Sequence, residues 1–270
     1  MPRERGNIEE TDMALSAPKS STDLFWDDRA TQERDLAKVN IADTVQRDHE
    51  LQFVFGLLES SMRMVEIGCG NGYVTQMLRS RVASVDAFDY AENMLERARQ
   101  AYGETNNRFL HDSVLEPKRI GSGYDAGLCV RVLINLRNLQ EQKCAVRNMA
   151  RMIRRGGRLI LIEGFRDGFD SINATRQAIG LKPANPAAIN FYCYLSDLMP
   201  TILEHFQIER TWHSGLFDFL TRIVYPQLVG ADKATEPGDF HLKVESIVRA
   251  NTLPDLGIYA RLRGFALVCE

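Results

Sequence analysis

The chain has 270 residues, of which 44% are hydrophobic, and its formal net charge is −3. This composition supports a sizeable core in one domain, or in one domain with a cap. The acidic balance and the lack of a basic tract exclude a nucleic-acid backbone as the expected partner. No run of about 18 apolar residues is present, so a membrane span is not expected either.

The first part of the chain predicts a tail followed by helix. Residues 1–24 are polar and lack the apolar core of a signal peptide, so a disordered tail is expected there. Residues 25–61 are expected to form a helical lid segment, since Leu51, Val54 and Leu58 recur at helical spacing. The five cysteines form no C-x-x-C pair and fit no zinc spacing, which favours reduced thiols, no metal site and a cytoplasmic location.

Strand and helix patterns alternate from residue 62 onward. Strands are predicted at 63–67, 83–88, 107–111, 124–130, 158–163, 206–212 and 259–269. Helices are predicted at 46–60, 73–80, 91–102 and 138–154. This alternation is typical of the α/β class, with a doubly wound, mostly parallel sheet of seven strands.

A glycine-rich turn follows the first predicted strand, in the segment Val65–Gly72. Glycine tolerates positive φ and lets the backbone approach a ligand, and the following helix start offers free N–H groups. Asp89 ends the next strand, where a carboxylate can bind both hydroxyls of a ribose. The dinucleotide pattern Gly-x-Gly-x-x-Gly would need a glycine where Tyr73 stands, so the spacing disfavours a pyrophosphate.

Five segments in order resemble the class I S-adenosylmethionine (SAM)-dependent methyltransferases, over roughly residues 62–165. They read VEIGCGNG, VDAFDYAENMLERAR, FLHDSV, YDAGLCVRVLINL and MIRRGGRLILIEG. The resemblance implies SAM as cofactor, S-adenosylhomocysteine (SAH) as product, and the fold of that class with helical cap insertions. The cofactor-binding residues that it implies are Glu66, Gly68, Cys69, Gly70, Asn71, Gly72, Asp89, Tyr90, Met94, Asp112, Ser113 and Val130.

The exit of the fourth predicted strand narrows the chemistry. Val130 to Leu133 contain neither the Asn/Asp-Pro-Pro-aromatic motif of amide and nucleobase N-methyltransferases nor an acidic pair for magnesium. This favours metal-independent O-methylation of a sugar, a surface glycan or a carboxylate-bearing metabolite. Arg131 is expected beside the sulfonium, and His213 and His241 are the candidate bases, because an alcohol acceptor needs one.

Two long segments, 164–195 and 214–257, leave the carboxyl ends of strands, where ligands bind in open α/β sheets. They are expected to close over the substrate as a lid, together with the segment around Trp26; surface decoration or a dimer contact is the alternative. The division of the chain is then a SAM-binding core at 62–163, these two insertions, a helix and sixth strand at 196–213, and a seventh strand at 258–270. The substrate-binding candidates are Trp26, Arg166, Arg176, Asn190 and Tyr192.

Two other functions stay open from the sequence. An NAD-type oxidoreductase shares the strand, glycine turn, helix and acidic residue. A methyltransferase-like protein that binds SAM without chemistry would keep the same motifs. A small-molecule acceptor is the expected partner, with neither nucleic acid nor membrane; the sequence leaves a homodimer open and does not name the acceptor.

Overall fold

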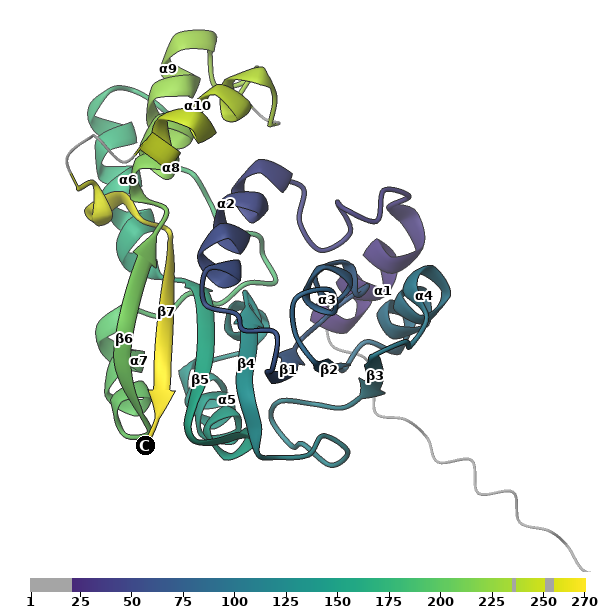
Figure 1. Cartoon of the computed structure of the whole chain (residues 1–270). Helices are drawn as coiled ribbons and strands as arrows, with labels where there is room; N and C mark the ends of the chain where they lie inside the picture. The colour runs from purple at the N-terminus through teal and green to yellow at the C-terminus, as the bar shows by residue number, and fades with distance from the viewer. Residues whose placement is uncertain (1–20, 235–236, 251–254) are drawn as a thin grey trace, which may run out of the picture.

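A seven-stranded sheet organises the computed structural model, which describes residues 21–234, 237–250 and 255–270 (Figure 1). The strand order is β3-β2-β1-β4-β5-β7-β6, and β7 alone among these strands runs antiparallel to both of its neighbours. The strands are β1 (Arg63–Ile67), β2 (Ser84–Asp89), β3 (Asn107–His111), β4 (Tyr124–Val130), β5 (Ile153–Gly164), β6 (Phe206–His213) and β7 (Leu262–Cys269).

This strand order confirms the predicted α/β class and its mostly parallel, doubly wound sheet. The dinucleotide-binding fold has the order 3-2-1-4-5-6 in a parallel sheet. Here an antiparallel β7 lies between β5 and β6, so the second half of the sheet differs from that fold. The topology therefore argues against the NAD-type alternative.

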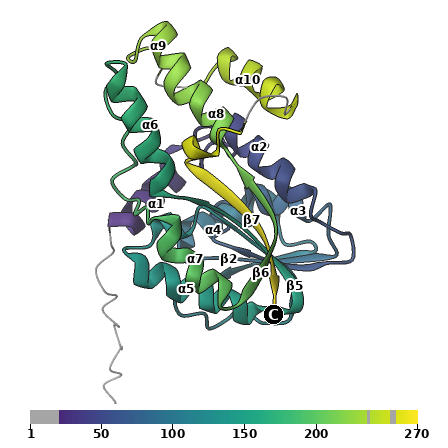
Figure 2. The same ribbon diagram turned by 90° about the vertical axis from the view of Figure 1, so that its left-hand side faces the viewer.

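Helices cover both faces of the sheet, and the strands alternate between two cores. Met64 and Ile160 pack toward α2 (Thr44–Phe55), α3 (Tyr73–Leu78) and α4 (Glu92–Tyr102). Val65 and Leu161 pack toward α5 (Leu139–Met152) and α7 (Leu195–Leu203) on the other face (Figure 2). This period of two, apolar on both sides, is what a parallel sheet buried between helices requires.

The helix and strand limits differ from the predictions mainly at element ends. The helix predicted at 46–60 begins at Thr44, capped by the Asp43 carboxylate, which accepts from the amide of Gln46 at 3.0 Å, and it ends before Gly56. The fifth strand begins at Ile153, directly after α5, rather than at residue 158. The tail predicted at 1–24 lies outside the described residues up to residue 20, and the structure is helical from Ser21 in α1 (Ser21–Gln32).

The two insertions form helices at the carboxyl edge of the parallel strands (Figure 1). The first contains α6 (Arg166–Ala178), and the second contains α8 (Gly215–Phe219), the π-helix η2 (Leu220–Val224), α9 (Tyr225–Val229) and α10 (Asp239–Ala250). Phe217 and Val244 of the second insertion pack on Val45 of α2. Two short 3-10 helices, η1 (Leu133–Asn135) and η3 (Gly257–Tyr259), complete the elements. In the described part of the chain, no helix has the length and apolar character to cross a membrane.

Candidate active site

The glycine turn between β1 and α3 takes the conformation that its sequence requires. Gly68, Gly70 and Gly72 have φ angles of 68°, 53° and 74°, a region that favours glycine. A side chain at Gly68 would also collide with Val132 beyond the end of β4. The turn therefore brings bare backbone to the carboxyl edge of the sheet, between β2 and β4.

A cavity of about 590 Å³ opens above this edge, within the size range of small-molecule sites. Its wall runs along the sheet, and we name its two parts by the strands below them. The β2–β3 end is lined by Asp89, at the end of β2, and by Asp112, just after β3. The β4–β5 end is lined by Arg131 and by Tyr192, whose ring lies against Gly164 at the end of β5.

The carboxylate of Asp89 is anchored to the glycine turn. Its Oδ2 accepts from the amide of Gly70 at 2.8 Å and its Oδ1 from the amide of Ala91 at 2.9 Å. The side chain is buried, and this burial raises its pKa. Because each oxygen has two lone pairs, both keep capacity for a donor from the cavity. The geometry is compatible with the predicted contact to ribose hydroxyls.

Glu66 lies one strand away, at the β1 position that precedes the glycines. Its Oε2 accepts from Oγ1 of Thr75 at 2.5 Å, and burial raises its pKa to about 8. Glu66 also lines the cavity. Glu66 and Asp89 give this side of the cavity acceptors for a ligand that carries hydroxyl and ammonium groups, as SAM does through its ribose and amino-acid tail.

Asp112 holds the backbone of the segment that follows β3, a role that the sequence did not indicate. Its two carboxylate oxygens accept from the amides of Ser113, Lys118, Arg119 and Ile120, at 2.7–3.1 Å. Burial acts to raise its pKa, but these amide hydrogen bonds outweigh burial and lower it. A carboxylate can accept about four hydrogen bonds, so these four amides occupy the acceptor positions of Asp112. Asp112 and Ser113 line the cavity, and their contact with adenine stays a prediction.

Most of the other predicted residues also reach the cavity wall. Those of the β2–β3 end come from α1, the glycine turn, α4 and the strand ends, since Trp26 of α1 packs with Met94, and those of the β4–β5 end come from β4 and the first insertion. The predicted residues that line it are Trp26, Glu66, Gly68, Cys69, Gly70, Asp89, Tyr90, Met94, Asp112, Ser113, Val130, Arg131, Asn190 and Tyr192. Asn71 and Gly72 do not line it; Nδ2 of the Asn71 side chain instead donates to the Leu36 carbonyl at 2.8 Å.

The two histidines predicted as bases are placed away from the cavity. Nε2 of His213 lies 2.9 Å from Oδ1 of Asp255, and its Nδ1 accepts from the amide of Gly215 at 3.2 Å. His241 is buried against Phe217, which lowers its pKa through desolvation. Neither ring lines the cavity, so the structure does not support either as a base. The sequence predicted on which segment each histidine lies, but it did not predict the direction of the side chain.

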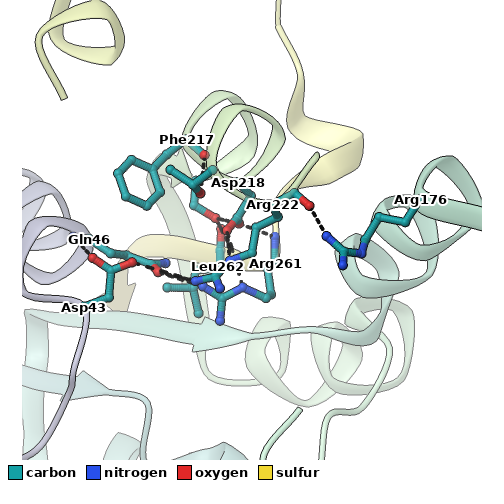
Figure 3. Close-up of polar contacts among 10 residues, drawn as sticks. Asp43, Gln46, Arg176, Phe217, Asp218, Arg222, Arg261 and Leu262 are labelled. Carbon is teal, nitrogen blue, oxygen red and sulfur yellow. Dashed lines mark hydrogen bonds and ion pairs between the residues drawn. The ribbon is translucent and has the colours of Figure 1, made fainter. Parts of the chain in front are cut away.

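The two arginines predicted to bind substrate also have other partners. Arg166 is exposed and pairs with Asp170 one turn along α6 at 3.0 Å. Arg176 is buried and donates to the carbonyls of Lys182, at 2.7 Å, and of Arg222. Neither guanidinium lines the cavity, and Arg176 instead ties α6 to the second insertion (Figure 3).

The second insertion does not cover the cavity as the lid prediction required. Among its described residues, none lines the cavity, whereas the first insertion supplies Ala187, Ile189, Asn190 and Tyr192. Instead, Asp218 of the second insertion holds Arg261, which does line the cavity. Asp218 is fully buried, accepts from the Arg261 amide at 2.9 Å and lies 3.3 Å from its Nε (Figure 3). The insertion therefore acts on the site by positioning Arg261.

The sequence analysis missed several polar residues of the cavity, among them Glu50, Asn135 and Arg261. Glu50 is the one that a signal could have revealed. It precedes Leu51 and stands four residues before Val54, so it falls on the apolar side of α2, where an acid is unexpected. All five cysteines are free, and the described residues contain no cluster of three or more metal-ligating side chains.

Comparison with known proteins agrees with this geometry. Residues 64–157 match the family model described as methyltransferase domain. The malonyl-acyl-carrier-protein O-methyltransferase of Bacillus cereus is 29% identical over 120 residues, which are 44% of this chain and 43% of that protein. The chain spans less than half the length of the curated relatives it matches.

Two solved structures share the fold. An N-methyltransferase from Bradyrhizobium japonicum in complex with SAH has a TM-score of 0.57 and 14% identity, over 93% of this chain and 99% of that one. Magnesium protoporphyrin IX methyltransferase from Synechocystis PCC 6803 with bound SAH has a TM-score of 0.57 and 19% identity, over 93% and 95%. Residues 64–157 therefore form a methyltransferase domain, and the chain has the fold of these two methyltransferases crystallised with SAH.

Proposed function

We propose that the protein transfers a methyl group from SAM to an oxygen of a small-molecule acceptor. The proposal is carried by one observation: the same cavity extends from the glycine turn and Asp89 to the β4–β5 end, where Arg131 and Arg261 line it. SAM supplies an electrophilic methyl group on a cationic sulfur. The protein's contribution is to align the two reactants and to exclude water.

The residues of the β2–β3 end are assigned to the cofactor. The oxygens of Asp89 face the ribose hydroxyls, and Met94, buried beneath this end, packs on the adenine side. Glu66 is assigned to the amino-acid tail, where a carboxylate complements an ammonium group. These assignments rest on the lining of the cavity and on the family's motif positions.

The residues of the β4–β5 end are assigned to the acceptor. Tyr192 of the first insertion offers an aromatic wall, while Asn190 and Arg261 offer donors. Trp26, a substrate candidate from the sequence, packs instead with Ala91 and Met94 at the β2–β3 end. An oxygen acceptor is supported by the Bacillus cereus relative, which is an O-methyltransferase. A sugar hydroxyl or a metabolite carboxylate are the two acceptor groups that this proposal admits.

Calorimetry with SAM, SAH and NAD tests the proposal at its first step. We expect SAM and SAH to bind with a Kd on the order of micromolar, near −8 kcal/mol, and NAD to show no heat of binding. Transfer of tritiated methyl from SAM to an acceptor then distinguishes an enzyme from a SAM-binding protein without chemistry. Binding of NAD in preference to SAM would contradict the proposal.

A further inference from the structure

A buried carboxylate in the β4–β5 end has no hydrogen-bond partner. Glu50 of α2 is fully buried and lines the cavity, and neither of its oxygens receives a hydrogen bond from the described residues. Its ion-pair contact is Nη2 of Arg131, 3.3 Å from Oε2. Burying a carboxylate with so few partners is costly unless a ligand completes them. The cavity is the side from which such a ligand would come.

Arg131 is held toward Glu50 in an unusual backbone conformation. Its φ is 54°, one of two positive values among the described non-glycine residues. This left-handed conformation costs a non-glycine residue about 1–2 kcal/mol. Strain of this kind persists where the surroundings fix it, often at functional sites. The amide of Arg131 donates to the Ile162 carbonyl at 2.8 Å, which fixes the turn at the end of β4.

A second acceptor group beside Arg131 also lacks a donor. The amide nitrogen of Asn135 donates to the Arg131 carbonyl at 2.7 Å, which leaves Oδ1 of Asn135 as the free acceptor. Oδ1 is buried without a partner, and Asn135 lines the cavity. Glu50 and Asn135 thus both lack donors at this end. A ligand with several hydroxyl groups would supply them.

The charges around Glu50 act in opposite directions on its pKa. Arg131 and Arg261 favour its ionised form, whereas Asp43 and Asp218 oppose it, and burial is the largest influence and raises its pKa. Arg261 is itself engaged by Asp218 and by Oε1 of Gln46, at 2.7 Å. Glu50 thus combines a raised pKa with two carboxylate oxygens that receive no hydrogen bond and a place in the cavity wall, where the proton of a bound ligand can reach it.

We propose that Glu50 is the general base that removes the proton of an acceptor hydroxyl, with Arg131 as its positioning residue. This inference rests on the proposed methyl transfer and selects a hydroxyl, rather than a carboxylate, as the acceptor group. The acceptor oxygen bonds to the methyl carbon as the carbon–sulfur bond breaks, and that electron pair stays on sulfur to give SAH. The hydroxyl proton passes to an Oε atom of Glu50, which becomes a neutral carboxylic acid. A carboxylate acceptor would bring no proton and would meet a like charge.

Carbon-13 NMR of the SAH-bound protein tests the base without an acceptor. Comparison of wild type with Glu50→Gln, both labelled at the glutamate δ-carbon, identifies the Glu50 resonance. We expect it to titrate above the ordinary glutamate value of about 4.3. Titration at or below that value would show a permanent ion pair with Arg131 and overturn the inference. Wild type and Glu50→Gln should bind SAH with affinities that differ by no more than about threefold. Loss of SAH binding in Glu50→Gln would show that Glu50 is a cofactor ligand instead.

Methyl transfer to a panel of probes tests the acceptor class. The panel contains neutral p-nitrophenyl glycosides, benzoate and p-nitrophenethylamine, with tritiated SAM as donor. We expect base-stable methyl ethers from the glycosides, a fall of about 10²–10⁴ in kcat/KM for Glu50→Gln, and loss of the acidic limb of the pH profile. Glu209→Gln, on exposed β6 and paired with Arg158, is the matched control. If label appears in methyl benzoate or in the methylated amine but in no methyl ether, the protein is a methyltransferase whose acceptor is not a hydroxyl, and the inference about Glu50 is refuted. If the protein does not bind SAM, the proposed methyltransferase function itself is refuted.

Discussion

The backbone amide of Gly70 donates to Oδ2 of Asp89 over 2.8 Å, and this bond joins the turn after β1 to the end of β2. The second carboxylate oxygen is fixed by the amide of Ala91. Two strand ends and one side chain are thereby held as a unit before any ligand arrives. A carboxylate oriented in this way loses little freedom when it binds two ribose hydroxyls.

Replacement of Asp89 by alanine is expected to weaken SAH binding by roughly 1.5–3 kcal/mol, the range for hydrogen bonds to a charged group. Titration calorimetry at constant pH measures the change. Asp170→Ala, which removes an exposed partner of Arg166, is the control and should bind as wild type does. An unchanged affinity in Asp89→Ala would contradict the ribose assignment.

Glu66 is expected to make the stability of the ligand-free protein fall as pH rises. Burial raises its folded-state pKa to about 8, whereas the unfolded chain titrates near 4.5. Between these values the folded state binds more protons, so its stability is greatest below pH 4.5 with respect to this group and is lost as pH rises through 8. The change is at most a few kcal/mol, since one pKa unit corresponds to about 1.4 kcal/mol.

Urea unfolding at several pH values between 5 and 8.5 measures this slope. Glu66→Gln keeps an acceptor for the Thr75 hydroxyl and cannot ionise, so its slope should be smaller than that of wild type. Glu163 contributes a slope of the same sign in both proteins, because burial raises its pKa to about 7. Equal slopes in wild type and Glu66→Gln would show that Glu66 titrates normally.

Asp218 is expected to be the most sensitive position of the second insertion. Its carboxylate lies 3.3 Å from Nε of Arg261 and 3.6 Å from Nε of Arg222, and both arginines are at the junction with α2 (Figure 3). Asp218→Ala leaves two cations without their buried partner and should lower the free energy of unfolding by about 3–5 kcal/mol. Urea unfolding measures it, and Asp218→Ala with Arg222→Met should recover part of the loss. No recovery would mean that Arg222 is not the destabilised group.

The core could be predicted from the sequence because its signals are local. Short apolar segments that alternate with helical patterns predict the strands, and the glycines predict the turn after β1. The position of Asp89 follows from its place at the end of a predicted strand. The β4–β5 end could not be predicted in the same way. His213 and Arg176 occupy expected segments, but their side chains are directed by Asp255 and by two carbonyls that the sequence does not place nearby. Glu50 of α2 lies in the cavity wall beside Arg131, just beyond β4, and this pairing of residues far apart in the chain has no local signal in the sequence.

Removal of divalent metal is expected to leave methyl transfer unchanged. The exit of β4 presents the cation of Arg131, and its neighbour Glu50 is already in contact with that guanidinium. A hard divalent cation needs several oxygen ligands and would be repelled by the arginine. Activity with a p-nitrophenyl glycoside, measured before and after EDTA treatment, checks this. A loss of activity that magnesium restores would contradict it.

His213 and His241 are expected to be dispensable for proton transfer. Both nitrogens of His213 already have partners, Asp255 and the Gly215 amide, and His241 is enclosed by Phe217, Tyr225 and Phe240. A general base must lie within hydrogen-bond reach of the proton that it removes. We therefore expect His213→Asn to keep kcat/KM within about threefold of wild type, with an unchanged pH profile.

The pH profile separates a base from a structural residue in this experiment. His241→Gln changes a buried contact and should lower the unfolding midpoint while the profile of the folded fraction keeps its shape. Glu50→Gln, measured beside it, should lose the acidic limb at little cost in SAH affinity. If His213→Asn abolished that limb and Glu50→Gln retained it, the base would be His213 at the end of β6, and the end of this strand would have to approach the cavity during turnover.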